Sequence, residues 1–424
     1  MKLIRSFSSL FIIVMLLQAT PISAATYPET NGKAVILMDA YSGRVLYERN
    51  SHEQLPPASL TKIMTALLVA ENGDLEQPVT ASEHAAATPE SSIYLEPGEV
   101  LSRMELLYAA MLPSANDACT ALAESIAGDE DSFVAQMNKR AAELGLKDTH
   151  FLNPHGLEAE GHYSSAYDLA LLSKEALSHQ VLAQIMATEK KVIPWAGKDE
   201  DRILLNHNRL LYNYDGAIGV KTGYTRQAGN CVVGAAQRGD MVLIAVTMNS
   251  PTVYNDLQQM LDYGFEQYKM VTLGKTGEVS GTVDVKQGVA AKVKATLARN
   301  LSIAATDEEI PHLAYSFTLK PNATAPIEPG EVLGTCRLYL KGEQIGSVDM
   351  VAGGKIGVKP SLMETSGLGR LATAVLSKWR VLCFGLMLSL VFYLCRRKLE
   401  EALKQIILFV LPARIKEQHR NHRF

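Results

Sequence analysis

The chain has 424 residues, enough for two or three domains of ordinary size. Its 41 lysines and arginines against 45 aspartates and glutamates leave a net charge of −4, and 47% of the residues are hydrophobic. This composition is typical of globular proteins and excludes collagen-like and wholly disordered chains, while the lack of a basic stripe with interleaved aromatic residues argues against a nucleic-acid partner.

The N-terminus has the three parts of a secretory signal peptide in their required order. Lys2 and Arg5 precede an unbroken apolar run over residues 10–17, and residues 23–25 are small, as a cleavage site requires. We therefore expect residues 1–25 to be a signal peptide, and the body of the protein to be exported from the cytoplasm.

The body begins with strands, continues with helices and returns to strands. Short strands are expected first, over residues 34–38 and 44–47. Apolar residues at helical spacing then predict helices over residues 60–71, 103–112, 117–127, 131–144 and 166–177. Strands are expected again over residues 217–223, 231–237 and 241–248, before a helix over residues 254–270. This order indicates an α/β domain over residues 26–270, in which one sheet carries an inserted helical subdomain.

The pattern changes after this domain. Residues 271–360 alternate apolar and polar side chains over short runs that are broken by Gly, Pro and Asn. This alternation is typical of strands, so we expect a small all-β domain over these residues. Residues 361–380 follow as a linker or stem.

Residues 381–395 contain no charged side chain, and a basic tail follows over residues 396–424, where eight Lys and Arg against three Glu give a local charge of +5. A run of fifteen is shorter than the ~20 residues that a spanning helix prefers, so a helix lying in the membrane interface is the alternative. Because positive residues stay on the cytoplasmic side, we expect a transmembrane helix with the tail inside and the body outside.

Three short motifs carry candidate chemistry, namely Ser59-Leu60-Thr61-Lys62, Ser114-Ala115-Asn116 and Lys221-Thr222-Gly223. The spacing of three puts Ser59 and Lys62 on one face of a helix that begins at Ser59. A serine hydroxyl needs a base beside it, and a lysine is a base only when its pKa is lowered. Burial and a neighbouring cation both lower a lysine pKa, and Lys221 is a candidate for that cation.

The other motif residues suggest roles that support the attack by Ser59. Ser114 could relay a proton, and Asn116 could hold either a substrate amide or Lys62. Gly223 would let a substrate backbone approach the strand that carries it. A second Lys-Thr-Gly triplet at Lys275 follows a predicted helix end, so we interpret it as a loop without a catalytic part.

The chain resembles the serine-type D-alanyl-D-alanine carboxypeptidases, which are the low-molecular-mass penicillin-binding proteins. The resemblance covers roughly residues 30–360 and rests on the three motifs together with residues 57–66, 111–118, 153–157, 161–166 and 219–225. It implies a β-lactamase/transpeptidase-like fold, with an antiparallel sheet, flanking helices and a helical subdomain, followed by the small all-β domain. The C-terminus departs from the family, because many relatives end in an amphipathic helix, whereas here the expected membrane helix is followed by a basic tail.

The resemblance also implies a reaction. Ser59 would attack the carbonyl between the two terminal D-alanines of a peptidoglycan stem peptide, Lys62 would take its proton, and Ser114 would return a proton to the leaving D-alanine. The amides of Ser59 and Tyr224 would form the oxyanion hole. Thr222 with Lys221 would bind the terminal carboxylate. β-Lactams would acylate Ser59 by the same route, and neither a metal nor another cofactor is expected.

His155 and His162, which a search for a catalytic triad would select, are loop residues in this family's pattern. Two alternatives share the acylation chemistry. A β-lactamase would need a carboxylate that activates water, and Glu158 and Glu160 lie in the right region of the chain. A membrane-tethered sensor of cell wall or antibiotic would be acylated at Ser59 without turnover.

Overall fold

The computed structural model describes residues 27–360, 379 and 383–404. The predicted signal peptide and most of the predicted stem and tail therefore lie outside the described residues. Those that are described divide into two compact units, the first with residues 27–280, 296–319 and 334–351 and the second with residues 281–295, 320–333 and those from 352 onward. The candidate site residues all belong to the first unit.

An antiparallel sheet forms the centre of the first unit, as predicted. In the described part of the chain it has five strands, β2 (Val45–Arg49), β1 (Ala34–Asp39), β9 (Met241–Met248), β8 (Gly229–Arg238) and β7 (Ala217–Thr225), in that order across the sheet. Val35 pairs with Thr247 and Val233 with Val246. Strand β7 is at one edge of this sheet, so the Lys-Thr-Gly motif that it carries is open to a neighbour on one side.

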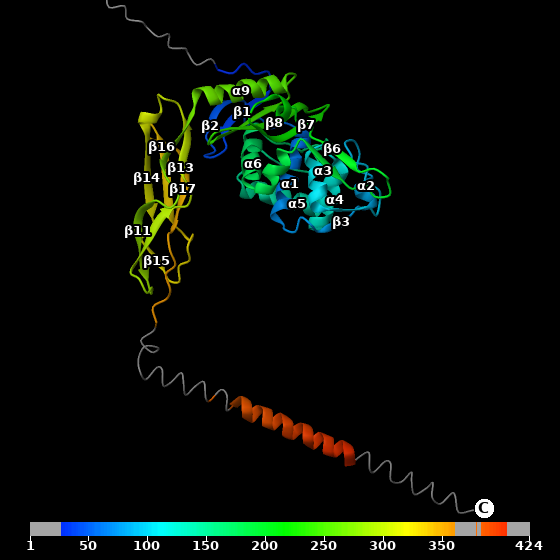
Figure 1. Ribbon diagram of the computed structural model, residues 1–424, viewed down its shortest axis with the longest axis vertical. Coiled ribbons are helices and arrows are strands. Elements are labelled where there is room, and N and C mark those ends of the chain that lie inside the picture. The colour runs from blue at the N-terminus through cyan, green and yellow to red at the C-terminus, as the bar shows by residue number, and fades with distance from the viewer. Residues whose placement is uncertain (1–26, 361–378, 380–382, 405–424) are drawn as a thin grey trace, which may run out of the picture. The chain divides into compact units, whose positions relative to one another are not determined.

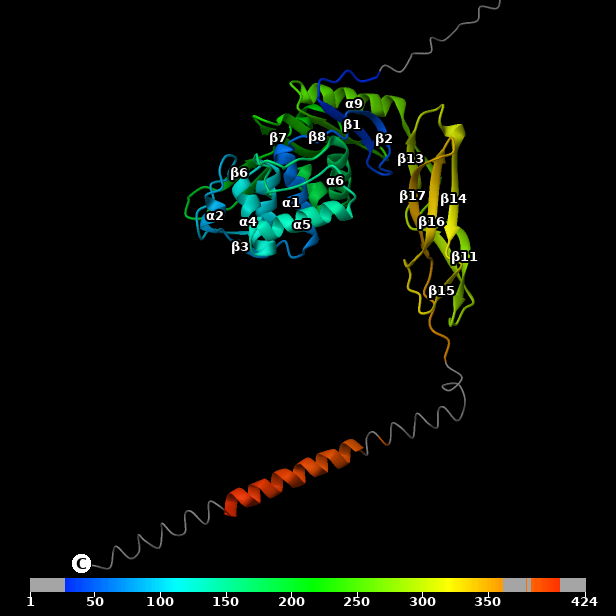
Figure 2. The ribbon, with the colours of Figure 1, turned by 180° about the vertical axis from the view of Figure 1, so that it is seen from behind.

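Both faces of the sheet are covered, which explains why every residue of β1 is buried. Ile36 and Met38 join a core that also contains residues of α1 and α6, whereas Val35 and Leu37 join a second core with residues of α9. Figures 1 and 2 show α9 on one side of the sheet and α1 and α6 on the other. The bounds of these helices are α1 (Lys62–Glu71), α6 (Ala166–Ser178) and α9 (Val253–Gln267).

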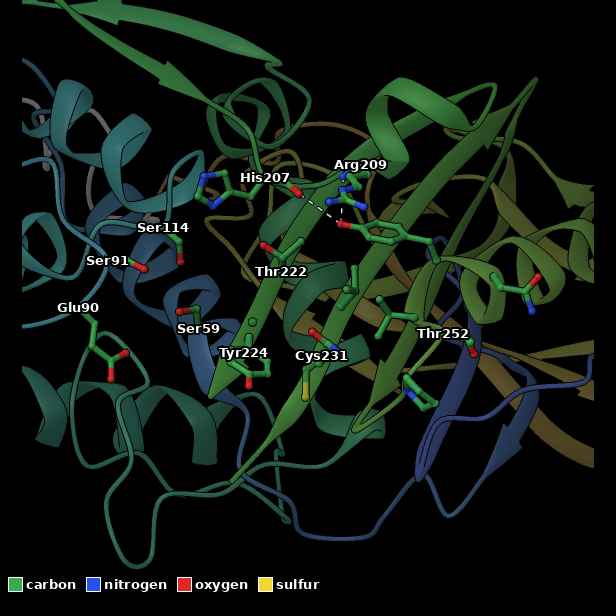
Figure 3. A pocket seen from close by; sticks show the side chains of 17 residues that line it. Ser59, Glu90, Ser91, Ser114, His207, Arg209, Thr222, Tyr224, Cys231 and Thr252 are labelled. Carbon is green, nitrogen blue, oxygen red and sulfur yellow. Dashed lines mark hydrogen bonds between the residues drawn. The ribbon is translucent and has the colours of Figure 1, made fainter. Parts of the chain in front are cut away.

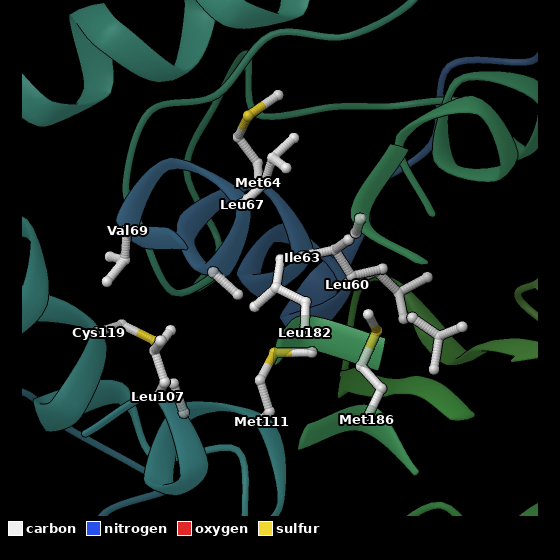
Figure 4. Close-up of a cluster of buried hydrophobic side chains, with 14 of the residues drawn as sticks. Leu60, Ile63, Met64, Leu67, Val69, Leu107, Met111, Cys119, Leu182 and Met186 are labelled. Carbon is white, nitrogen blue, oxygen red and sulfur yellow. The ribbon is translucent and has the colours of Figure 1, made fainter. Parts of the chain in front are cut away.

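Helix α1 is the centre of the helical subdomain. It is almost wholly buried, because helices pack around it on several sides (Figure 4). Ile63 and Leu67 lie in the core that also holds Leu107, Met111 and Leu182. The helices around α1 are α6, α3 (Arg103–Met111), α4 (Asn116–Ala127), α5 (Glu130–Glu143) and α7 (Gln180–Met186), and the short α2 (Glu83–Ala86) packs on α4. This packing fixes the start of α1, where Lys62 is the first residue and Ser59 lies in the turn just before it.

Most of the long predicted helices are confirmed, and the short elements between them were missed. The pairs β3 (Pro78–Thr80) with β4 (Val100–Ser102) and β5 (Lys190–Ile193) with β6 (Arg202–Leu205), together with α2, α7 and α8 (Leu210–Asn213), were not predicted. The predicted helix over residues 254–270 is too long. It ends at Gln267, because Lys269 already begins β10 (Lys269–Gly274), which pairs with β13 (Leu301–Ala305).

The residues that follow are all β, as predicted. In the first unit β14 (Leu313–Leu319) pairs antiparallel with β16 (Val332–Leu340), and in the second unit β11 (Val279–Lys286) pairs parallel with β15 (Asn322–Thr324). The remaining elements here are β12 (Lys292–Leu297), β17 (Glu343–Ala352) and the short 3₁₀ helix η2 (Ile310–His312). The second Lys-Thr-Gly triplet lies in the turn between β10 and β11, where the Lys275 amide donates to the Glu278 carboxylate.

Residues 383–404 form a helix near the C-terminus. Among the described residues, no helix combines the length and the apolar character that crossing a membrane requires. The start of the predicted span, residues 381–382, and the end of the basic tail, residues 405–424, lie outside the described residues.

Candidate active site

Ser59 lies in a single 3₁₀ turn, η1 (Ala58–Thr61), and not in the first turn of an α-helix as predicted. Helix α1 follows directly, so the spacing of three still places Lys62 beside Ser59. Two glycines let other segments reach this turn. A Cβ on Gly156 would lie 1.9 Å from the Ala58 carbonyl oxygen, and one on Gly223 would lie 3.0 Å from the Ser59 amide nitrogen.

The contact at Gly223 gives this glycine a reason within the protein itself, and the approach of a substrate backbone to its strand stays a prediction. The missing side chain makes room for the protein's own backbone at Ser59. The consequence for the site is direct, because Gly223 holds β7 against the nucleophile turn and thereby sets the distance between the Ser59 and Tyr224 amides.

Lys62 is fully buried, and its Nζ has three oxygen neighbours. Nζ lies 3.0 Å from Ser59 Oγ, 2.7 Å from Asn116 Oδ1 and 2.6 Å from the carbonyl oxygen of His155. A neutral amine has two N–H donors and one lone pair, and two of these neighbours are pure acceptors. The site therefore fits a neutral Lys62 that donates to Asn116 and His155 and accepts the Ser59 hydroxyl proton.

Burial lowers the pKa of Lys62 from 10.5 to about 8, against the charges of Asp117 and Glu90, which raise it. Of the two predicted causes, burial is confirmed as the main one, and the charge of Lys221 is not among the causes that act on Lys62. Lys221 is itself buried, and burial together with the charge of Lys62 holds its pKa well below the usual range. The positive charges of two buried ammonium groups repel each other, so the neutral form of an amine is favoured at this place.

Asn116 is the first residue of α4, and both polar atoms of its side-chain amide are hydrogen-bonded. Its Nδ2 donates to the carbonyl of Pro89 at 2.7 Å, which turns Oδ1 toward Lys62. Of the two partners predicted for Asn116, the structure therefore shows Lys62. Ser114 precedes the helix with φ +67°, and its buried hydroxyl has no hydrogen-bond partner among the described residues. Neither Ser114 nor Asn116 caps α4, whose N-cap is Ala115 without a side-chain bond.

The β7 residues divide between the sheet interior and the cavity. Thr222, Gly223 and Tyr224 line the same cavity as Ser59 and Ser114, whereas Lys221 is buried and donates to the Thr222 carbonyl at 3.2 Å. The cavity has a volume of about 730 Å³. The structure thus brings the three predicted motifs together.

Sequence reasoning missed several residues of this cavity. His207 and Arg209 contribute from the segment before β7, and Glu90 and Ser91 from the loop before β4 (Figure 3). The Arg209 amide and the His207 carbonyl both bond to the Tyr254 hydroxyl, which ties this segment to α9. No local motif marks these residues, because they reach the cavity only through the tertiary fold.

The two histidines of the middle loop do not form a triad with Ser59. His162 bonds through Nε2 to Thr61 Oγ1, and His155 contributes its backbone carbonyl to Lys62. Burial lowers the pKa of His155 to about 3 and that of His162 to about 4, so both are neutral at physiological pH. Glu158 and Glu160 line a separate cavity, and the Glu158 carboxylate accepts from the Gln227 amide.

Within the described residues, one group could hold a metal ion, formed by Glu71, Glu175 and His179. It does not line the Ser59 cavity, and Arg140 already forms ion pairs with both of its glutamates. These carboxylates are therefore neutralised within the protein and take no part in the chemistry at Ser59.

Two family models match the chain. One described as D-alanyl-D-alanine carboxypeptidase matches residues 21–252, and one described as penicillin-binding protein 5, C-terminal domain, matches residues 268–357. Among curated proteins, the D-alanyl-D-alanine carboxypeptidase DacF of Bacillus subtilis is 38% identical over 364 residues, covering 82% of this chain and 93% of the relative. DacC of Escherichia coli is 36% identical over 334 residues, covering 75% and 82%.

Solved structures agree with these matches. Penicillin-binding protein 5 from Haemophilus influenzae superimposes with a TM-score of 0.64 at 28% identity, covering 78% of this chain and 99% of that one. Penicillin-binding protein 6B from Escherichia coli gives a TM-score of 0.60 at 29% identity, with coverage of 78% and 98%. Both the sheet with its helices and the C-terminal β region are thus shared with these proteins.

Proposed function

The chain belongs to the D-alanyl-D-alanine carboxypeptidase family of serine hydrolases and penicillin-binding proteins, and we propose that it removes the terminal D-alanine of peptidoglycan stem peptides through an acyl-enzyme on Ser59. The observation that carries the assignment of roles is the set of three neighbours around Lys62 Nζ. It suits a neutral amine that takes the proton of the attacking hydroxyl.

The first step is acylation. As the Ser59 oxygen bonds to the carbonyl carbon, its proton passes to Lys62 Nζ, and negative charge collects on the carbonyl oxygen between the amides of Ser59 and Tyr224. The C–N bond then breaks, and the leaving amine of D-alanine takes a proton. Ser114 has its unpaired hydroxyl in the same cavity, so it is the proposed relay for that proton. Water then cleaves the ester and regenerates Ser59.

The terminal carboxylate of the substrate needs a positive charge in the open cavity. Lys221 is buried and bonds to the backbone of its own strand, and burial lowers its pKa. Arg209 lines the cavity, is exposed and carries a permanent charge. We therefore assign carboxylate binding to Thr222 together with Arg209, and to Lys221 the support of the Thr222 carbonyl.

The place of the reaction follows from the substrate. Peptidoglycan lies outside the cytoplasm, and the charged start, apolar run and small residues over positions 1–25 have the form of an export signal. We propose an exported enzyme held at the cell membrane by its C-terminal segment.

Steady-state release of D-alanine from Nα,Nε-diacetyl-L-lysyl-D-alanyl-D-alanine tests the activity, with Ser59→Ala as the control. We expect turnover by the native chain, covalent labelling by penicillin, and loss of both in Ser59→Ala, because within the described residues Ser59 Oγ is the hydroxyl bonded to Lys62. Labelling without D-alanine release would indicate a sensor, and rapid hydrolysis of penicillin would indicate a β-lactamase. Labelling that survives Ser59→Ala would refute the nucleophile.

A further inference from the structure

The Ser59 cavity has opposite charges on its two sides. Arg209, which carries a permanent positive charge, lines it on one side of Ser59, and Glu90 lines it on the opposite side (Figure 3). Glu90 and Ser59 line the same cavity, and the Glu90 carboxylate is close enough to Lys62 to raise its pKa. A molecule that extends across Ser59 therefore passes from a positive to a negative environment.

The residues on either side of Glu90 are both hydrogen-bonded to Asn116. The carbonyl of Pro89 accepts from Asn116 Nδ2 at 2.7 Å, and the carbonyl of Ser91 accepts from the Asn116 amide at 2.6 Å. The next residues of the loop are held by Asp117, whose carboxylate accepts from Ser92 Oγ and from the amides of Ile93 and Leu95. The loop that carries Glu90 is thus fixed by the same helix, α4, that positions Lys62.

The backbone at Glu90 is strained, with φ +68°, a conformation that residues with a side chain rarely adopt. Its side chain is exposed and lines the cavity, and none of the side chains drawn in Figure 3 is hydrogen-bonded to its carboxylate. A charged residue in a strained position, with its carboxylate free in the active-site cavity, has the features of a ligand-binding group.

The direction of the substrate follows from the proposed function, on which this inference rests. With the terminal carboxylate at Thr222 and Arg209 and the reacting carbonyl at Ser59, the residues that precede the two D-alanines continue on the far side of Ser59. Glu90 lies on that side. We propose that Glu90 binds the side-chain ammonium of the residue before the D-alanyl-D-alanine pair, so that the enzyme selects stem peptides in which this amine is free.

Two peptides that differ only in this amine test the inference. They are Nα-acetyl-L-lysyl-D-alanyl-D-alanine, whose ε-amine is free, and its Nα,Nε-diacetyl analogue. For the native chain we expect kcat/KM to be about fivefold higher for the free amine, which is the effect of an exposed ion pair near the upper end of its range. This preference should decrease as salt is added.

The ratio of kcat/KM for the free-amine peptide to kcat/KM for the diacetylated peptide should be about one in Glu90→Gln and below one in Glu90→Lys. Glu160→Gln is the matched control, because it removes the same charge from the neighbouring cavity, and it should keep the native ratio. Because both kcat/KM values in a ratio come from the same variant, a general loss of activity cancels. Penicillin labelling shows whether the active site of each variant is still folded.

The outcomes separate this inference from the proposed function. Cleavage of the diacetylated peptide without a preference for the free amine overturns the inference and leaves the carboxypeptidase activity in place, whereas failure to cleave either peptide overturns both. A preference that persists in Glu90→Gln, or that is lost in Glu160→Gln, also overturns it. Accumulation of acyl-enzyme from both peptides in Glu90→Gln would assign Glu90 to the activation of water instead.

Discussion

At the scale of single residues, the chemistry depends on Lys62, because its amine is surrounded by hydrogen-bond acceptors and is buried from solvent. Asn116 and the His155 carbonyl accept two N–H bonds, and the third neighbour of Nζ is the nucleophile. The two buried lysines are not equivalent. Lys62 touches the Ser59 hydroxyl, whereas Lys221 bonds to the backbone of its own strand, so only Lys62 is placed to act as a base.

The pKa of Lys62 predicts the pH dependence of acylation. Only the neutral amine accepts the serine proton, so the second-order rate constant for penicillin acylation should rise about tenfold per pH unit below the pKa of about 8 and level off above it. His155 and His162, with pKa values of about 3 and about 4, should add no step between pH 5 and 8. Stopped-flow labelling across pH 5.5–9.5 measures this profile.

The control for that profile is Lys62→Arg, because an arginine stays protonated throughout the range and should leave acylation undetectable. Lys275→Arg makes the same exchange in an exposed turn and should keep the native profile. A profile that is flat from pH 6 to 8, or one that shows a step near 6.5, would contradict Lys62 as the base.

At the scale of elements, regular patterns were predictable and close approaches were not. The three motifs and the helices and strand that carry them could be predicted from the sequence, because each has a local signature. The short helix α7 and the segment of His207 and Arg209 have none, and their positions depend on packing against residues far along the chain. The Lys-Thr-Gly motif marks Gly223 in the sequence, but only the folded chain shows that this glycine faces the Ser59 amide.

Gly156 gives a test of these close approaches. It has φ +89°, and an added Cβ would lie 1.9 Å from the Ala58 carbonyl oxygen. Gly161 has φ +91° in the same loop, but its nearest neighbour would be the Leu152 side chain at 3.6 Å. Alanine at Gly161 should cost about 1 kcal/mol of unfolding free energy for the left-handed backbone alone, and alanine at Gly156 about 3 kcal/mol or more, because the nucleophile turn must also move.

Urea unfolding and the rate of penicillin acylation measure the two effects together. We expect Gly156→Ala to slow acylation by at least tenfold, since it displaces the turn that holds Ser59, and Gly161→Ala to leave the rate near the native value. Equal effects of the two substitutions on acylation would mean that the Gly156 loop does not position the nucleophile.

At the scale of the whole molecule, the fold decides between sequence features that look alike. The chain has two Lys-Thr-Gly triplets, and the fold confirms the choice that their sequence context suggested, with Lys221 on the edge strand beside Ser59 and Lys275 in a turn between strands of the β region. The C-terminal region also contacts the sheet within the first unit, where Arg44 forms an ion pair with Glu309 and the Tyr41 hydroxyl donates to the Asn300 carbonyl. The sequence predicted the β region but not these contacts.

The anchor is predicted from the sequence alone. Residues 381–395 are uncharged, and three cations follow at once within a tail of charge +5. Each charge costs about 2.5–3.5 kcal/mol at the centre of a bilayer, so the tail should stay on the cytoplasmic side while the exported body lies outside. Lys378 and Arg380 can extend toward the outer interface, which lengthens a run that is otherwise short.

A chain that stops after residue 360 should therefore be released into the medium and should still cleave small D-alanyl-D-alanine peptides, because Ser59, Lys62 and the cavity around them belong to the first unit. The full chain should sediment with membranes. Protease added to intact protoplasts should remove the body and spare an epitope placed after Phe424. Digestion of that epitope from outside would place the tail on the outer face, and the segment over residues 381–395 would then be a helix lying in the interface.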